Sequence, residues 1–187
     1  LPFVLFMDDP IVVMGICGSY DLDSANGRML ELILRECDNL GAETVVWDHG
    51  KRPLPLVGAN GSWDDSNVKA FQEMAVSADA YVLSSPEYHG TMSGVMKNSL
   101  DWLYSKHTSG KVFALVSTLG GQGSNNTLNH MRIAARWIHG WVIPEQVAVP
   151  HIKSAFDEDG ELLSSDVNDR VLSISASLIE NTTKLRR

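Results

Sequence analysis

The sequence predicts an α/β domain with a doubly wound, five-stranded parallel sheet and helices on both faces. Short apolar runs alternate along the chain with segments of helical periodicity, which is the order expected of βαβ units. Residues 11–17 are continuously apolar, a pattern typical of a strand buried on both faces of a parallel sheet. A chain of 187 residues suits one domain with a substantial core and leaves little room for a second.

Five apolar runs are predicted to be strands. Gly18 and Ser19 end the first run, and the third leads directly into a tight turn. The last run contains Pro144, which cannot donate a backbone hydrogen bond, so this strand is expected at an edge of the sheet. The runs are residues 11–17, 45–47, 80–83, 112–117 and 142–149.

Helices are predicted where apolar residues recur three or four positions apart. The first such series runs from Met29 to Cys37 and ends at the C-cap candidate Gly41. Residues 48–66 contain several Pro and Gly and are predicted to be an irregular connection. The other helices are expected over residues 67–78, from residue 94 onward, over 128–137, and, after an acidic turn at 157–160, over 167–185.

Composition excludes several classes of function. The formal net charge is -8, whereas proteins that bind nucleic acid or anionic membranes carry a basic face, so neither partner is expected. Two cysteines, Cys17 and Cys37, cannot form a disulfide framework and fit small core positions. The histidines are scattered without an HxxxH pair, so no metal site is expected. Residues 1–9 lack the features of a signal peptide and are expected to be a flexible extension of a cytoplasmic protein.

The most informative segment is residues 84–102, SSPEYHGTMSGVMKNSLDW. It joins a strand to a helix through a turn that carries Gly and hydroxyl groups. This layout suits a polar ligand held at the carboxyl edge of a sheet. The turn, named the second loop, consists of Pro86, Glu87, Tyr88, His89, Gly90 and Thr91.

Two further loops follow strands that end at the same edge, where loops of a doubly wound sheet converge. The first loop, residues 18–28, begins with Gly18 and suits a phosphate monoester, because it offers polar donors beside a helix N-terminus. The donors are Ser19, Ser24 and Asn26. Ser24 fits a simple helix N-cap equally well.

The third loop, residues 117–123, begins with Ser117 and Thr118 and continues with Gly120, Gly121 and Gly123. Glycines free the backbone for close contact with a flat ligand. Two other clusters are expected to serve packing. Trp137, His139 and Trp141 suit the core or an interface, and the helical part of the signature suits capping, salt bridging or packing through Lys97, Asn98, Asp101 and Trp102.

Residues 84–102 resemble the PEYN/H-G-S…KN-x-x-DW signature of the NAD(P)H-dependent FMN reductase family, which includes quinone, azo-dye and chromate reductases. The resemblance extends roughly from the first to the fifth strand and implies a flavodoxin-like fold. The first loop is similar to the family's FMN phosphate loop, G-S-x-R followed by S-x-N. Asp21 stands where the family usually has Arg, so its carboxylate would have to point away from the phosphate.

The resemblance implies that FMN is bound non-covalently by all three loops, with the second loop along the flavin ring and the third completing the ring site. The flavin carries the chemistry, so no catalytic side chain is expected; His89 is either solvated or an acid–base group. The implied cofactor-binding residues are Gly18, Ser19, Ser24, Asn26, Pro86, Glu87, Tyr88, His89, Gly90, Thr91, Ser117, Thr118, Gly120 and Gly121.

The implied activity is hydride transfer from NADPH or NADH to FMN and then to a small-molecule electron acceptor, with ping-pong kinetics. The acceptor could be a quinone, azo dye, nitro compound, chromate, ferric chelate or free FMN. The resemblance also implies a homodimer or homotetramer. Three alternatives stay open: a flavin reductase that releases reduced FMN to a partner monooxygenase, a flavodoxin-type electron carrier not reduced by NAD(P)H, and a flavin-free binding protein.

Overall fold

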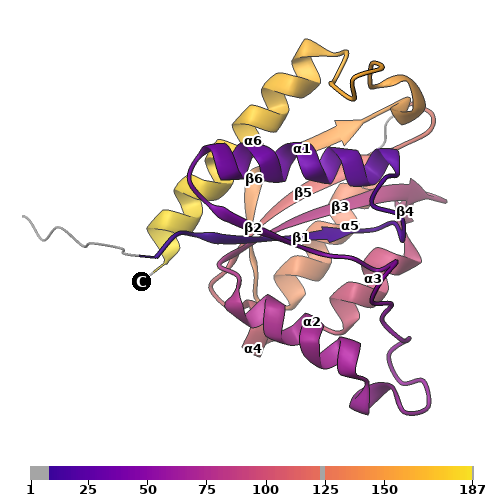
Figure 1. The fold of residues 1–187 in the computed structure, drawn as a ribbon, viewed down its shortest axis with the longest axis vertical. Coiled ribbons are helices and arrows are strands. Elements are labelled where there is room, and N and C mark those ends of the chain that lie inside the picture. The colour runs from indigo at the N-terminus through magenta and orange to yellow at the C-terminus, as the bar shows by residue number, and fades with distance from the viewer. Residues whose placement is uncertain (1–8, 123–124, 187) are drawn as a thin grey trace, which may run out of the picture.

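Five parallel strands form the centre of the protein (Figure 1). The computed structural model describes residues 9–122 and 125–186, so the predicted extension at 1–9 falls outside the described residues except for residue 9. The strands lie in the order β2-β1-β3-β5-β6, which confirms the doubly wound parallel sheet. Their bounds are Val12–Cys17 for β1, Glu43–Trp47 for β2, Ala80–Tyr88 for β3, Val112–Thr118 for β5 and Trp141–Val149 for β6.

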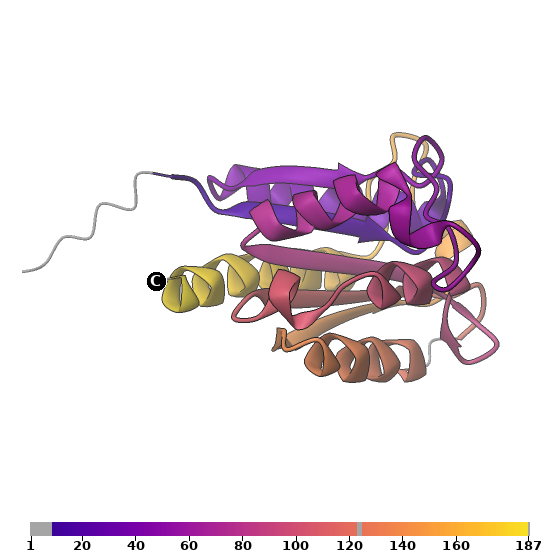
Figure 2. The same cartoon turned by 90° about the horizontal axis from the view of Figure 1, so that it is seen from below.

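Helices cover both faces of this sheet (Figures 1 and 2). One face packs against α1 (Ala25–Asn39) and α6 (Ser165–Leu185). The other packs against α2 (Ser66–Ser77), α3 (Gly94–Asp101) and α5 (Asn126–Trp137), and the short helix α4 (Ser105–Thr108) lies beside α2. Short 3-10 turns lie at Ser62–Asp64 and Ile152–Ser154. Within the described ranges, no helix is long and apolar enough to cross a membrane.

Two apolar cores result because successive side chains of a strand point to opposite faces. In β1, Val13 packs toward α1 and α6, whereas Met14 packs toward the opposite helices. The second core contains the large aromatic residues Trp102, Phe71 and Phe113, all fully buried. Cys17 and Cys37 are buried in the first core, as predicted, and are free thiols.

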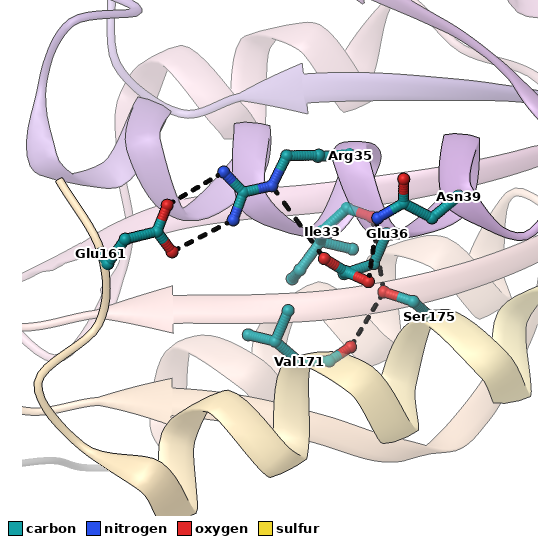
Figure 3. Close-up of polar contacts among 7 residues, drawn as sticks. All are labelled: Ile33, Arg35, Glu36, Asn39, Glu161, Val171 and Ser175. Atoms are coloured by element: carbon teal, nitrogen blue, oxygen red, sulfur yellow. Dashed lines mark hydrogen bonds and ion pairs between the residues drawn. The ribbon is translucent and has the colours of Figure 1, made fainter. Parts of the chain in front are cut away.

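Helix α1 also makes polar contacts with α6 and with the loop that precedes α6 (Figure 3). The guanidinium of Arg35 donates two hydrogen bonds to the carboxylate of Glu161, over 3.1 and 3.2 Å. Both side chains are half exposed, so the pair contributes at most about 1 kcal/mol. The buried hydroxyl of Ser175 donates to the carbonyl oxygen of Val171 over 2.8 Å and approaches that of Ile33 at 3.4 Å.

The structure differs from the sequence prediction mainly around β3. This strand continues through residues predicted to be a turn and pairs with an antiparallel strand, β4 (Thr91–Met92). The four-residue helix α4 was not predicted. The edge position of β6 is confirmed, and its pairing with β5 shifts register around Pro144, between the pairs Phe113–Val142 and Leu115–Gln146.

Candidate functional site

The three predicted loops follow β1, β3 and β5, which are neighbours in the sheet and end at the same edge. From β1 the chain passes to β2 on one side and then returns to β3 on the other side of β1. The direction in which strands are added to the sheet therefore reverses between β1 and β3. Ligands of open α/β sheets bind in the crevice at this switch point. The edge lies on the side of β4 in Figure 1, and Figure 2 shows it with the hairpin projecting beyond the helices.

The first loop turns sharply into α1, whose N-cap is Ser24. The Ser24 hydroxyl accepts a hydrogen bond from the backbone N–H of Gly27 at 3.1 Å, so the capping role is present. The carboxylate of Asp21 accepts from the backbone N–H of Asp23 at 2.9 Å. Asp21 is thus engaged within its own loop, where it satisfies a donor. Ser19 is half-buried and lies two residues after the end of β1.

Asn26 is buried rather than exposed at the loop surface. Its side-chain Nδ2 donates to the carbonyl oxygen of Ser84 over 2.9 Å, and Oδ1 lies 3.2 Å from the hydroxyl of Thr118. Burial raises the pKa of the neighbouring Cys17 thiol, so this sulfur stays protonated at neutral pH. The interior beneath the first loop is therefore uncharged and hydrogen-bonded.

The second loop is a β-hairpin. Tyr88 and Thr91 pair across it, and the two residues between them, His89 and Gly90, have positive φ angles of 51° and 78°. Positive φ at both central positions is the mark of the tight turns that suit the twist of hairpin strands. Tyr88 and His89 are exposed, whereas Pro86 is buried. The hairpin therefore presents its backbone and two aromatic side chains at the sheet edge.

The third loop leaves β5 after Ser117 and Thr118, both buried. A Cβ placed on Gly120 or Gly121 would meet no atom within 4 Å, and neither residue has a positive φ. Neither the backbone conformation nor the packing therefore requires glycine at these two positions. The space beside them is open and could take a flat ligand. Gly123 lies outside the described residues. Together with the α1 N-terminus, this open glycine surface fits a nucleotide-like cofactor with a phosphate and a planar ring.

Ser93, which is not among the predicted site residues, links the first loop to the hairpin by hydrogen bonds. Its hydroxyl donates to the carbonyl oxygen of Gly18 over 2.6 Å, and its backbone N–H donates to the Ser85 hydroxyl over 3.0 Å. The same hydroxyl caps α3 by accepting from the N–H of Met96. A serine directly before a predicted helix is an N-cap signal that could have identified it.

The remaining residues of the signature support the fold. Lys97 and Asp101 form an exposed ion pair at 2.6 Å, and the buried indole of Trp102 donates to the carbonyl oxygen of Pro55. Asn98 bonds the backbone at Leu54 and Pro55 and so holds the irregular connection against α3. These contacts agree with the predicted salt bridging and packing.

A cavity of about 560 Å³ lies between α3 and α5, beside the hairpin. Thr91 lies at its rim, where its hydroxyl is 2.8 Å from Nδ1 of His130. The apolar lining continues to two exposed residues of α5, Ile133 and Trp137. Trp137 is 83% exposed, so the core position considered for it is wrong and the interface position remains. Among the described residues, no group of three or more His, Cys, Asp or Glu could hold a metal ion.

Sequence comparisons identify relatives that are named for their activities. Residues 11–154 match the family model described as NADPH-dependent FMN reductase. The chain is 35% identical to the NADPH-dependent FMN reductase ArsH of Acidithiobacillus ferrooxidans, over 96% of this chain and 76% of that protein. It is 31% identical to the FMN-dependent NADPH-azoreductase of Staphylococcus haemolyticus, over 81% of this chain and 83% of that protein.

Solved structures share the fold. FerB, a flavoenzyme NAD(P)H:(acceptor) oxidoreductase from Paracoccus denitrificans, has a TM-score of 0.78 at 20% identity, covering 93% of this chain and 98% of that one. A flavodoxin from the domain Archaea has a TM-score of 0.61 at 11% identity, covering 94% and 99%. At these identities the likeness shows the fold alone, and it confirms the flavodoxin-like prediction.

Proposed function

Because this chain belongs to the NADPH-dependent FMN reductase family, we propose that its three loops hold FMN across the carboxyl ends of β1, β3 and β5. The protein is an FMN-dependent oxidoreductase that uses NAD(P)H. One observation carries the assignment of the site: the first loop, the hairpin and β5 are joined by hydrogen bonds at one sheet edge, through Asn26 and Ser93.

The phosphate end of FMN is assigned to the first loop. Ser19, the Ser24 hydroxyl and the positive end of the α1 dipole supply donors and partial charge for an anion. Asp21 opposes this assignment by its charge, but its carboxylate is bonded to the N–H of Asp23. The site therefore relies on neutral donors where the family usually has an arginine. We expect this chain to hold the phosphate more weakly than family members that have the arginine.

The ring end is assigned to the second and third loops. Bound FMN supplies the hydride-accepting and hydride-donating ring. The hairpin backbone and the open surface at Gly120 and Gly121 would hold and orient this ring. No side chain is proposed to carry the hydride. Tyr88 and His89, both exposed, border the approach that NADPH and the acceptor would use in turn.

The acceptor is proposed to be a small aromatic or quinone-like molecule. One relative is named an azoreductase, and an open glycine-lined surface imposes little shape selection. We also propose that the chain is one domain that works in the cytoplasm, which is supported by its use of NAD(P)H and by two buried free thiols. A second copy of the chain is proposed to cover the apolar residues Ile133 and Trp137.

An absorption spectrum of the purified protein tests this proposal. Added FMN should give a bound-flavin band that bleaches with anaerobic NADPH and returns when a quinone or azo dye is added. A bound band that persists with NADPH would instead indicate an electron carrier. Loss of flavin on gel filtration after reduction would favour delivery of reduced FMN to a partner enzyme. Failure to bind FMN would contradict the site.

A further inference from the structure

The first residue of the first loop and Asn26, near its other end, are held by a single oxygen atom. The backbone N–H of Gly18 donates to the carbonyl oxygen of Ser84 over 2.7 Å, and Nδ2 of Asn26 donates to the same oxygen over 2.9 Å. Ser84 belongs to β3, directly beside β1. The segment from Gly18 to Asn26 is thus closed into a ring whose span is fixed by one carbonyl group of the neighbouring strand.

The Asn26 amide has no hydrogen-bonding capacity left for a ligand. Nδ2 also donates to Sγ of Cys17 at 3.3 Å, and Oδ1 accepts from the hydroxyls of Ser84 and Thr118 at 2.9 and 3.2 Å. An asparagine side chain offers two donor hydrogens and two acceptor lone pairs, and all four are used. The reverse orientation of the amide would oppose Oδ1 to the Ser84 carbonyl, so this orientation is the favourable one.

The partners of Asn26 come from three neighbouring strands. Cys17 ends β1, Ser84 lies in β3 and Thr118 ends β5. Asn26 is 4% exposed, Thr118 2% and Ser84 0%. Hydrogen bonds shielded from water in this way are strong, and a missing partner is costly. This buried network therefore fixes the position of the first loop relative to the third loop.

We propose that Asn26 is a positioning residue for FMN and does not itself touch the cofactor. It fixes the first loop relative to β5, and therefore also the separation between the phosphate donors of the first loop and the glycines of the third loop. This inference rests on the proposed function. Preorganised loops bind more tightly because the ordering cost falls on folding rather than on binding. Asn26 therefore acts on FMN affinity through Ser84 and Thr118.

A double-mutant cycle tests this role. Asn26→Ala should weaken FMN binding by about tenfold, the scale of one or two lost buried hydrogen bonds, and Ser84→Ala by a smaller factor. Because both changes break the same network, the double variant should bind FMN no more weakly than Asn26→Ala alone.

Ser175→Ala provides a matched control. It removes another fully buried hydroxyl with a carbonyl partner, at the α1–α6 contact in Figure 3, away from the loops. It should lower the melting temperature as Ser84→Ala does while leaving the FMN dissociation constant unchanged. That contrast separates positioning from general destabilisation.

Two results would overturn the inference while leaving the function intact. One is an unchanged FMN affinity in Asn26→Ala, and the other is FMN losses that multiply in the double variant, as expected if Asn26 contacted the phosphate directly. If Asn26→Ala does not fold, Ser84→Ala alone decides, because its fully buried hydroxyl can weaken FMN binding only through the network. Failure of the wild type to bind FMN would refute the proposed function instead.

Discussion

The carbonyl oxygen of Leu22 lies 2.0 Å from the point where a Cβ on Gly27 would stand. Gly27 is in the first turn of α1, and Leu22 is in the loop that precedes it. The first loop can fold back onto the start of the helix only because residue 27 has no side chain. The carbonyl belongs to the backbone and cannot swing aside as a side chain could.

Gly27→Ala should therefore displace the first loop. The expected result is a lower melting temperature together with FMN binding weakened by about tenfold or more, because the phosphate donors move with the backbone. Gly94→Ala is the control, since a Cβ there, also in the first turn of a helix at this edge, meets nothing within 4 Å. Equal FMN affinities of the Gly27 and Gly94 variants would contradict the explanation.

Gly90→Val should weaken FMN binding through the hairpin. The φ of Gly90 is 78°, a conformation that costs a β-branched residue about 1–2 kcal/mol, although its Cβ would meet only Asn126 Nδ2 at 3.9 Å. Gly41→Val imposes similar strain at φ 90°, but at the other end of α1. Titration with FMN should separate the two variants, and an equal loss of affinity in both would argue against contact between the hairpin and the flavin.

Ser19→Ala should weaken FMN binding without lowering stability, because the hydroxyl is assigned to the phosphate. Riboflavin, which lacks the phosphate, should bind the variant and the wild type equally. Fluorescence titration with the two flavins gives the comparison. If the variant lost as much affinity for riboflavin as for FMN, Ser19 would contact the flavin ring instead of the phosphate.

Acid should destabilise the fold through His49. This residue is 2% exposed, and burial lowers its pKa to about 4. The unfolded chain takes up a proton on His49 near pH 6.5, whereas the folded chain does so only near pH 4. The free energy of unfolding should therefore be highest above pH 6.5 and fall by about 3 kcal/mol as the pH drops to 4. His107, whose pKa burial also lowers, acts in the same direction, so the comparison must isolate His49.

Urea unfolding of the wild type and of His49→Gln between pH 4 and 7 measures this effect. The free energy of unfolding should depend less steeply on pH in the variant than in the wild type. Ser99→Ala, which removes the hydroxyl 3.1 Å from Nε2 of His49, should keep the wild-type slope because burial is the main cause. Parallel curves for the wild type and His49→Gln would exclude the histidine as the origin.

Trp137→Glu should disrupt self-association. The indole is 83% exposed and lines the cavity between α3 and α5 with Ile133, so a second copy is the proposed cover. Sedimentation velocity should show the wild type as a dimer or tetramer and the variant as a smaller species. Leu172→Glu, at an exposed position of α6, should leave assembly unchanged. A monomeric wild type would contradict this interface.

Local patterns in the sequence predicted most of the fold. Continuous apolar runs predicted β1, β3 and β5, since strands buried on both faces must be apolar throughout. Pro144 predicted the edge position of β6 because it cannot donate to a ladder. The turn at residues 86–91 was predicted from Gly90, but the pairing of Tyr88 with Thr91 depends on a partner strand and was not.

By itself, the sequence determined which residues belong to the three loops and which chemistry they offer, because turn formation and donor type are local properties. Only the tertiary structure decided what each side chain does. Asn26 has the same amide whether it faces a phosphate or Ser84, and the packing of β1 against β3 buries it. Likewise, helical spacing cannot show whether Trp137 faces the core or solvent. Burial and hydrogen-bond partners arise from contacts between distant segments, and these contacts exist only in the folded chain.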